Sequence, residues 1–251
     1  MMKHHRHQKC ETGSPKLQRR LLLAAGLACL IGSAGQSAEP ASTQVVVLGD
    51  SITKGVRPGV KPEETFGSLL AAALQRRGLA AEVHNLGIGG ERTDQALTRL
   101  DRDVLSLRPR VVTLMYGTND SYVDQGARTS RITVAQYRQN LTRLVTRLRE
   151  GGARPVLMTP PRWAQDAAPN GLGENPNARL EPYVQACRDV ARELHVPLVD
   201  HFDGWTHAAA RGVNLRDWTT DGCHPNPRGH QELAERMVPA VVNTLTQEAG
   251  K

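Results

Sequence analysis

The sequence predicts an α/β fold, a three-layer α/β/α sandwich of the flavodoxin-like type with about five parallel strands. Short runs rich in β-branched residues alternate with longer stretches whose apolar residues recur at helical spacing, which is typical of βαβ units around a parallel sheet. The segment 39–251 also has the length of one sizeable α/β domain, enough to bury a core without disulfides or metals.

The expected strands are short segments at residues 44–48, 81–85, 111–115, 155–158 and 196–199. Between and after them, apolar residues fall on one face of four helical patterns. These patterns run from Phe66 to Leu74, from Val134 to Leu148, from Tyr183 to Leu194 and from Leu233 to Val241, the second ending at Gly151 and Gly152. No internal repeat or interdomain linker interrupts the series, so we expect one domain over residues 39–251.

Residues 1–38 do not fit this pattern, and we expect them to be a cleaved signal peptide. A basic stretch ending at Arg19 and Arg20 precedes an apolar run at 21–31 and a small, polar segment at 32–38, which is the order of a secretory signal. The apolar run has about 11 residues, well short of the roughly 20 of a membrane span. We therefore expect an exported protein, periplasmic or secreted, with no permanent membrane span. The alternative is an N-terminal extension on a cytosolic protein.

The charge of the whole chain does not describe the expected domain. The chain has 32 Lys and Arg against 25 Asp and Glu, a formal charge of +7. Removing the six bases and one acid of residues 1–38 leaves 26 against 24, a net charge of +2. No basic run interleaved with aromatic residues occurs in this part, so we expect no nucleic-acid partner.

Two cysteines, Cys187 and Cys223, remain in the expected domain. An exported protein can join such a pair in a disulfide, but their spacing along the chain does not set the distance between them. Two free thiols are therefore an equally good expectation. No pattern in the sequence indicates an oligomeric state.

Polar motifs follow the first three expected strands. Ser51 comes after the first strand, the glycine-rich segment 87–90 after the second, and Asn119 after the third. Ligands of open α/β sheets bind beyond the carboxyl ends of the strands, where the strand order reverses. We therefore expect these motifs to meet at one edge of the sheet.

The motif Asp221-Gly-Cys-His224-Pro lies far downstream and completes a possible reactive group. A serine hydroxyl becomes a good nucleophile when an imidazole takes its proton and a carboxylate fixes the imidazole tautomer. Taken singly, each motif has a plainer interpretation: Ser51 as a helix cap, Asn119 as a turn residue, and Asp221 with His224 as the entry to a helix.

Taken together, the motifs resemble those of the SGNH/GDSL hydrolase family. The resemblance spans residues 44 to about 240, with four blocks in the family order. These blocks are Gly49-Asp50-Ser51, Gly90, Gly117-Thr118-Asn119-Asp120 and Asp221-x-x-His224-Pro225.

The resemblance implies a serine esterase that needs no cofactor and no metal. Ser51 would attack the ester carbonyl, His224 would act as base and then as acid, and Asp221 would orient the imidazole. The oxyanion would be held by the backbone N–H groups of Ser51 and Gly90 and by the side-chain amide of Asn119. The rate should rise with pH through a pKa near that of histidine.

Several polar neighbours are expected to have structural roles. Asp50 and Asp120 should hold loops through backbone hydrogen bonds, and Cys223 should not act as a nucleophile although it adjoins His224. The polar cluster after the fifth strand lacks recognised zinc spacings, and we expect no metal there. This cluster contains Asp200, His201, Asp203 and His207.

Tryptophans give the only indication of substrate. Trp163 follows the fourth strand, and Trp205 and Trp218 follow the fifth, all in segments expected to be polar loops on the active edge. A polar rim with tryptophans suits a sugar ring better than a fatty-acyl chain. We therefore expect a short-acyl ester, most simply an acetyl ester, of a carbohydrate or other small molecule. The alternative role for the tryptophans is to anchor long loops to the sheet.

Two other functions fit the same motifs. The first is a lysophospholipase or thioesterase that hydrolyses longer acyl chains, because the fold alone does not select the substrate. The second is a carbohydrate-binding protein that keeps the fold without activity. The presence of Ser51, Asn119, Asp221 and His224 argues against the second.

Overall fold

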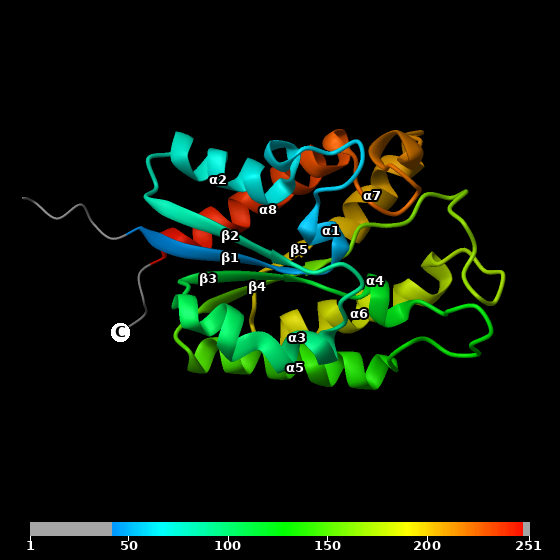
Figure 1. The fold of residues 1–251 in the computed structure, drawn as a ribbon, viewed down its shortest axis with the longest axis horizontal. Helices are drawn as coiled ribbons and strands as arrows, with labels where there is room; N and C mark the ends of the chain where they lie inside the picture. Colours follow the sequence, from blue (N-terminus) through cyan, green and yellow to red (C-terminus); the bar gives the residue numbers. More distant parts are fainter. Residues whose placement is uncertain (1–41, 248–251) are drawn as a thin grey trace, which may run out of the picture. The chain divides into compact units, whose positions relative to one another are not determined.

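The computed structural model describes residues 42–247, which form a parallel sheet covered by helices on both faces (Figure 1). The five strands lie in the order β2-β1-β3-β4-β5, and every neighbouring pair is parallel. This is the flavodoxin-like order, so the predicted fold class is confirmed. The strands are β1 (Thr43–Gly49), β2 (Ala81–Gly87), β3 (Val111–Met115), β4 (Arg154–Thr159) and β5 (Leu198–Asp200).

Helices α2, α7 and α8 cover one face of the sheet, and α3, α5 and α6 cover the other (Figure 1). Two further helices, α1 and α4, are single turns at the carboxyl ends of β1 and β3. The helices are α1 (Ser51–Lys54), α2 (Phe66–Arg76), α3 (Thr93–Arg99), α4 (Thr118–Ser121), α5 (Val134–Glu150), α6 (Asn177–Glu193), α7 (His201–Ala210) and α8 (Pro227–Thr246), with shorter helical turns at Pro62–Glu64, Leu100–Val104, Leu105–Leu107 and Leu215–Trp218.

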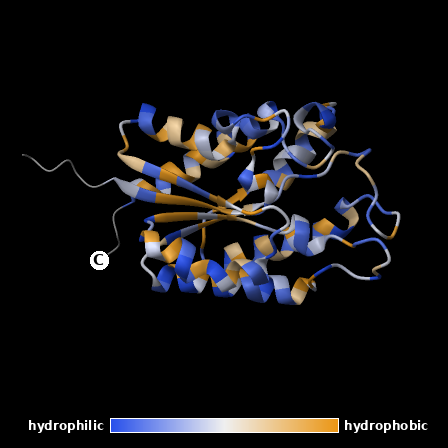
Figure 2. Cartoon of the chain, viewed as in Figure 1, coloured by the Kyte–Doolittle hydropathy of each residue, from blue (hydrophilic) through white to orange (hydrophobic). Residues whose placement is uncertain are grey.

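Alternate residues of each central strand belong to different halves of the core. In β1, Val45 and Val47 pack toward α2 and α8, whereas Val46 and Leu48 pack toward α5. All four side chains are fully buried, which explains why the strand is continuously apolar in sequence. Figure 2 shows the same arrangement, with hydrophobic strands between helices whose outer surfaces are hydrophilic.

The carboxyl ends of β1 and β2 are packed closely against their neighbours, and each strand ends in a glycine. A Cβ at Gly49 would lie 2.6 Å from the carbonyl oxygen of Met115 on β3. A Cβ at Gly87 would lie 2.1 Å from the backbone nitrogen of Lys54 on α1. These two glycines therefore let α1, the β2–α3 loop and β3 converge at the point where the strand order reverses.

The expected signal peptide lies outside the described residues. Among residues 42–247, no helix has the length and apolar character needed to cross a membrane. Cys187 and Cys223 are both buried, and both are free thiols.

Candidate active site

Ser51, His224 and Asp221 form a continuous chain of hydrogen bonds at the carboxyl edge of the sheet. The Oγ of Ser51 lies 2.9 Å from Nε2 of His224, across a sequence separation of 173 residues. On the other side of the ring, Nδ1 of His224 lies 2.8 Å from Oδ2 of Asp221. These are the distances at which an imidazole can accept a serine proton while a carboxylate holds its other nitrogen.

A tight turn after residues Leu215–Trp218 sets the relation between Asp221 and His224. Oδ1 of Asp221 accepts hydrogen bonds from the backbone N–H groups of Cys223 at 3.0 Å and His224 at 2.8 Å. Gly222 has a φ of 87°, which is unfavourable for other residues. One oxygen of Asp221 thus shapes the turn while the other contacts the imidazole, and this explains the Asp-x-x-His spacing.

The charges of the carboxylate and the imidazole are set by their surroundings. Burial acts to raise the pKa of Asp221, but hydrogen bonds from His224 and from the backbone of Cys223 outweigh it and lower the pKa to about 2. Burial lowers the pKa of His224, and the neighbouring Asp221 carboxylate only partly offsets this. The carboxylate is therefore ionised and the imidazole neutral at neutral pH, the state a general base requires.

Arg57 contacts the same carboxylate, and sequence reasoning missed it. Its Nη2 donates to Oδ2 of Asp221 at 2.8 Å, the oxygen that also faces His224. The cation stabilises the ionised carboxylate and lowers the pKa of the imidazole beyond the effect of burial. No motif spacing marks an arginine that lies 164 residues from its partner.

Gly90 lies in the loop between β2 and α3, exposed and with a φ of 77°. Apart from Gly90 and its two chain neighbours, no atom of residues 42–247 lies within 4 Å of the position that a Cβ would occupy there. The next residue fixes the loop, because the buried Glu91 carboxylate accepts hydrogen bonds from Arg99 at 2.6 Å and from the Tyr116 hydroxyl at 2.7 Å. The backbone at Gly90 is therefore exposed to solvent, while the hydrogen bonds of the adjoining Glu91 hold the loop in place.

Asn119 is tied to the residue that precedes the serine. Its Nδ2 donates to Oδ2 of Asp50 at 3.2 Å, and its Oδ1 accepts from Nη1 of Arg131 at 3.1 Å. The other oxygen of Asp50 accepts from the backbone N–H of Ile52 at 2.8 Å and so caps α1. Burial raises the pKa of Asp50 to about 7, against the effect of these hydrogen bonds.

Asp120 also has a loop-holding contact of the kind expected for it. Its Oδ1 accepts from the backbone N–H of Thr93 at 2.9 Å and from the Thr93 hydroxyl at 2.6 Å. This contact joins α4 to the start of α3.

Cys223 is buried, and burial raises the pKa of its thiol well above the ordinary range, which disfavours the thiolate that a nucleophile would need.

The structure corrects the expectation that all three tryptophans line the active edge. Trp205 lies on α7 with no exposed surface, and Trp218, in the turn Leu215–Trp218, is 4% exposed. Their rings pack edge to face at 5.2 Å within the core beneath α8. They anchor this part of the chain to the sheet, the alternative considered above. Trp163 is partly exposed and stacks on Tyr122 at 6.1 Å, so only this tryptophan can contact a ligand at the rim.

The polar cluster after β5 is occupied by structural contacts. Asp200 accepts from Arg188 at 2.7 Å and from Thr159 at 2.9 Å, and Nδ1 of His207 lies 3.1 Å from the carboxylate of Asp203. His201 is completely buried, and burial lowers its pKa to about 3. Within residues 42–247, no group of three or more His, Cys, Asp or Glu side chains is arranged to hold a metal ion.

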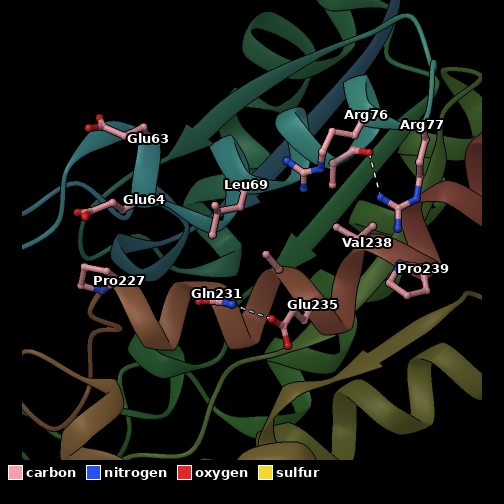
Figure 3. Close-up of a pocket in the computed structure, with 12 residues that line it drawn as sticks. Glu63, Glu64, Leu69, Arg76, Arg77, Pro227, Gln231, Glu235, Val238 and Pro239 are labelled. Atoms are coloured by element: carbon pink, nitrogen blue, oxygen red, sulfur yellow. Dashed lines mark hydrogen bonds between the residues drawn. The ribbon is translucent and has the colours of Figure 1, made fainter.

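A separate groove of about 500 Å³ lies between α2 and α8 and contains no residue of the Ser51 site (Figure 3). Its floor is formed by apolar side chains such as Leu69 and Val238. Charged side chains stand at its borders, with Glu63 and Glu64 toward one end and Arg76 and Arg77 toward the other.

Comparison with known proteins identifies the family. Residues 47–232 match the model of the GDSL-like lipase/acylhydrolase family, which is most of the chain. The protein belongs to this family. The GDSL-like chain is 30% identical to the isoamyl acetate-hydrolyzing esterase 1 homolog of Mus musculus over 79% of its own length and 81% of the relative. It is 26% identical to the acetylxylan esterase of Geobacillus stearothermophilus, over 78% of this chain and 92% of that enzyme.

Solved structures agree with this assignment. The crystal structure of a lipase/acylhydrolase from Enterococcus faecalis superposes with a TM-score of 0.66 at 25% identity, covering 83% of this chain and all of that one. The GDSL-like fold and its esterase relatives identify the protein as a carboxylic ester hydrolase.

Proposed function

We propose that the protein hydrolyses its ester through an acyl-enzyme formed on Ser51. Ser51 Oγ attacks the carbonyl carbon while its proton passes to Nε2 of His224. The bond to the alcohol oxygen then breaks, and His224 protonates the leaving alcohol. Water attacks the acyl-serine, gives a proton to His224, and releases the carboxylic acid as Ser51 recovers its proton. The observation that carries this proposal is the hydrogen-bonded chain from Ser51 through His224 to Asp221.

The tetrahedral intermediates carry a negative charge on the former carbonyl oxygen. We assign its stabilisation to the backbone N–H groups of Ser51 and Gly90 and to the side-chain amide of Asn119. Support comes from the open backbone at Gly90 and from the hydrogen bond that joins Asn119 to Asp50, next to the serine. Loss of one such donor commonly costs about 10²–10³ in rate.

For the substrate, we propose a short-acyl ester, specifically an acetyl ester of a carbohydrate. Two relatives are named for hydrolysing acetyl esters, isoamyl acetate in one case and acetylated xylan in the other. Trp163 and Tyr122 offer stacked, partly exposed rings in loops at the active edge, and such rings suit a sugar face.

A second candidate is an acetyl ester of an apolar alcohol. Three large hydrophobic side chains of the described residues are exposed, and all lie in loops at the carboxyl edge of the sheet: Val56, Ile88 and Leu172. An ester of an apolar alcohol, such as the isoamyl acetate for which one esterase relative is named, fits such a rim. The two candidates share the acetyl group and differ in the alcohol.

We also propose that residues 1–38 direct export and that residues 39–251 form the mature esterase domain. The order of basic, apolar and small residues in this segment supports the proposal. Mass measurement of the protein recovered outside the cytoplasm tests it, since an unprocessed N-terminus at Met1 would contradict it.

Acyl-chain length tests the proposed substrate class. We expect p-nitrophenyl acetate to be hydrolysed with a kcat/KM at least about 10-fold higher than p-nitrophenyl octanoate, because the two relatives that support the proposed substrate are named for acetyl esters. The values of kcat/KM for acetylated xylo-oligosaccharides and for isoamyl acetate then distinguish the carbohydrate from the apolar alcohol. A preference for octanoyl or longer esters would exclude both acetyl-ester candidates in favour of the long-chain hydrolase.

The pH dependence of kcat/KM follows from the proposed role of His224. Because the neutral imidazole acts as base, the rate should rise with pH and reach a plateau. Burial lowers the pKa of His224, so the midpoint of the rise should lie below the ordinary histidine value of 6.5. The measurement is kcat/KM for a non-ionising ester from acid to neutral pH. A midpoint above 6.5, or a rate independent of pH, would contradict the assignment.

A further inference from the structure

Asn119 can stabilise an oxyanion only if its amide is turned the right way. The two ends of a carboxamide have nearly the same shape, but one end donates hydrogen bonds and the other accepts them. A rotation of 180° would replace the N–H at the oxyanion with an oxygen, and the interaction would become repulsive. Whatever fixes this rotation therefore controls the third proposed donor.

Two charged side chains hold the amide from opposite ends. Asp50 accepts from Nδ2 at 3.2 Å, and Arg131 donates to Oδ1 at 3.1 Å. A carboxyl group can accept a hydrogen bond or, when protonated, donate one, so Asp50 alone does not impose one orientation. A guanidinium has only donors, so Arg131 can form a hydrogen bond with Asn119 only when the amide oxygen Oδ1 faces it.

Arg131 is itself held in place. Its Nε and Nη2 donate to the carboxylate of Asp124 at 2.8 and 2.6 Å, which leaves Nη1 to reach Asn119. Its guanidinium also lies 5.1 Å from the centre of the Tyr122 ring. The backbone N–H of Arg131 donates to the carbonyl of Tyr122 at 3.0 Å, which closes the loop back onto the end of α4.

We propose that Arg131 is a positioning residue for ester hydrolysis, which turns the Asn119 amide so that an N–H, and not the oxygen, faces the tetrahedral oxyanion. The proposal rests on the oxyanion role assigned to Asn119 above. Nδ2 carries two hydrogens, so one N–H bonds to Asp50 and the second is available to the oxyanion. Arg131 acts through Asn119 and needs no contact with the substrate.

Replacement of Arg131 in two backgrounds tests this. Arg131→Met should lower kcat for p-nitrophenyl acetate by about 10-fold or more with KM changed less than about twofold, because only transition-state binding is affected. Arg131→Lys keeps a donor and should recover part of the loss. In the Asn119→Ala background, Arg131→Met should have no further effect on kcat. Arg128→Met, an exposed arginine of the same loop, is the matched control and should behave as wild type.

The outcomes separate this proposal from the one on which it rests. If Asn119→Ala leaves kcat unchanged, the oxyanion role of Asn119 is wrong. If Asn119→Ala lowers kcat but Arg131→Met lowers it by the same factor with or without Asn119, Arg131 supports the loop in another way and the inference is wrong. A rise in KM at unchanged kcat would make Arg131 a substrate-binding residue and would also overturn it.

Discussion

Ser51→Ala is expected to lower kcat/KM for p-nitrophenyl acetate by at least about 10³-fold, with the fold unchanged. Removal of Oγ eliminates the acyl-enzyme route, and the remaining oxyanion donors can only assist direct attack by water. The side chain is partly exposed and its hydroxyl bonds to His224, so alanine leaves no large cavity in the core. Steady-state kinetics together with far-UV circular dichroism measure the two parts of this prediction.

Ser106→Ala is the matched control for this experiment. Ser106 is an exposed serine far in sequence from Ser51, Asp221 and His224, and its hydroxyl donates to the backbone carbonyl of Arg102. Its replacement should leave kcat/KM unchanged. If Ser51→Ala kept more than about a tenth of the activity while folded, another nucleophile would be responsible and the acyl-enzyme proposal would fail.

Asp221→Asn is expected to lower kcat by about 10³–10⁴-fold. The amide oxygen can still accept from the N–H groups of Cys223 and His224, so the turn should persist. The amide nitrogen, however, would face Nδ1 of His224 as a donor and favour the tautomer that places a proton on Nε2, where the base must be free. Activity is thus lost although the site keeps its shape.

Arg57→Met is the variant to compare with Asp221→Asn, because it removes the cation that contacts Asp221 and leaves the carboxylate in place. Its effect on kcat should be much smaller than that of Asp221→Asn. Since Arg57 lowers the pKa of His224, its removal should move the acid limb of the pH profile to higher pH. A loss of less than about 10-fold in Asp221→Asn would show that Asp221 does not set the imidazole tautomer.

Strands β1, β3 and β4 could be predicted because most of their side chains are buried on both faces of the sheet, so these strands read as short, mainly apolar runs. Among the strands, the expected and observed boundaries differ most for the fifth, which is expected at 196–199 and found at Leu198–Asp200. Pro197 has no N–H to donate, which delays the start of the strand. The expected convergence of Ser51, Gly90 and Asn119 on one edge follows from parallel strand direction alone, and these residues do follow β1, β2 and β3.

The features of the site and core that the sequence does not predict depend on contacts between residues distant in the chain. The sequence predicts loops at Trp205 and Trp218 because polar segments are expected after the fifth strand, yet α7 places Trp205 in the core against Trp218. Arg57 and Arg131 resemble many other arginines of the chain until the fold brings them to Asp221 and Asn119. Short motifs predict which residues take part in the proposed reaction, whereas the arginines proposed to orient them follow no fixed spacing.

Covalent labelling of the mature protein tests the central proposal, nucleophilic attack by Ser51, most directly. A fluorophosphonate probe should add one group per molecule, and mass spectrometry of the peptides should locate it on Ser51. Ser51→Ala should prevent labelling, and Ser106→Ala should not. An active protein that stays unlabelled, or a label on any residue other than Ser51, would contradict the account.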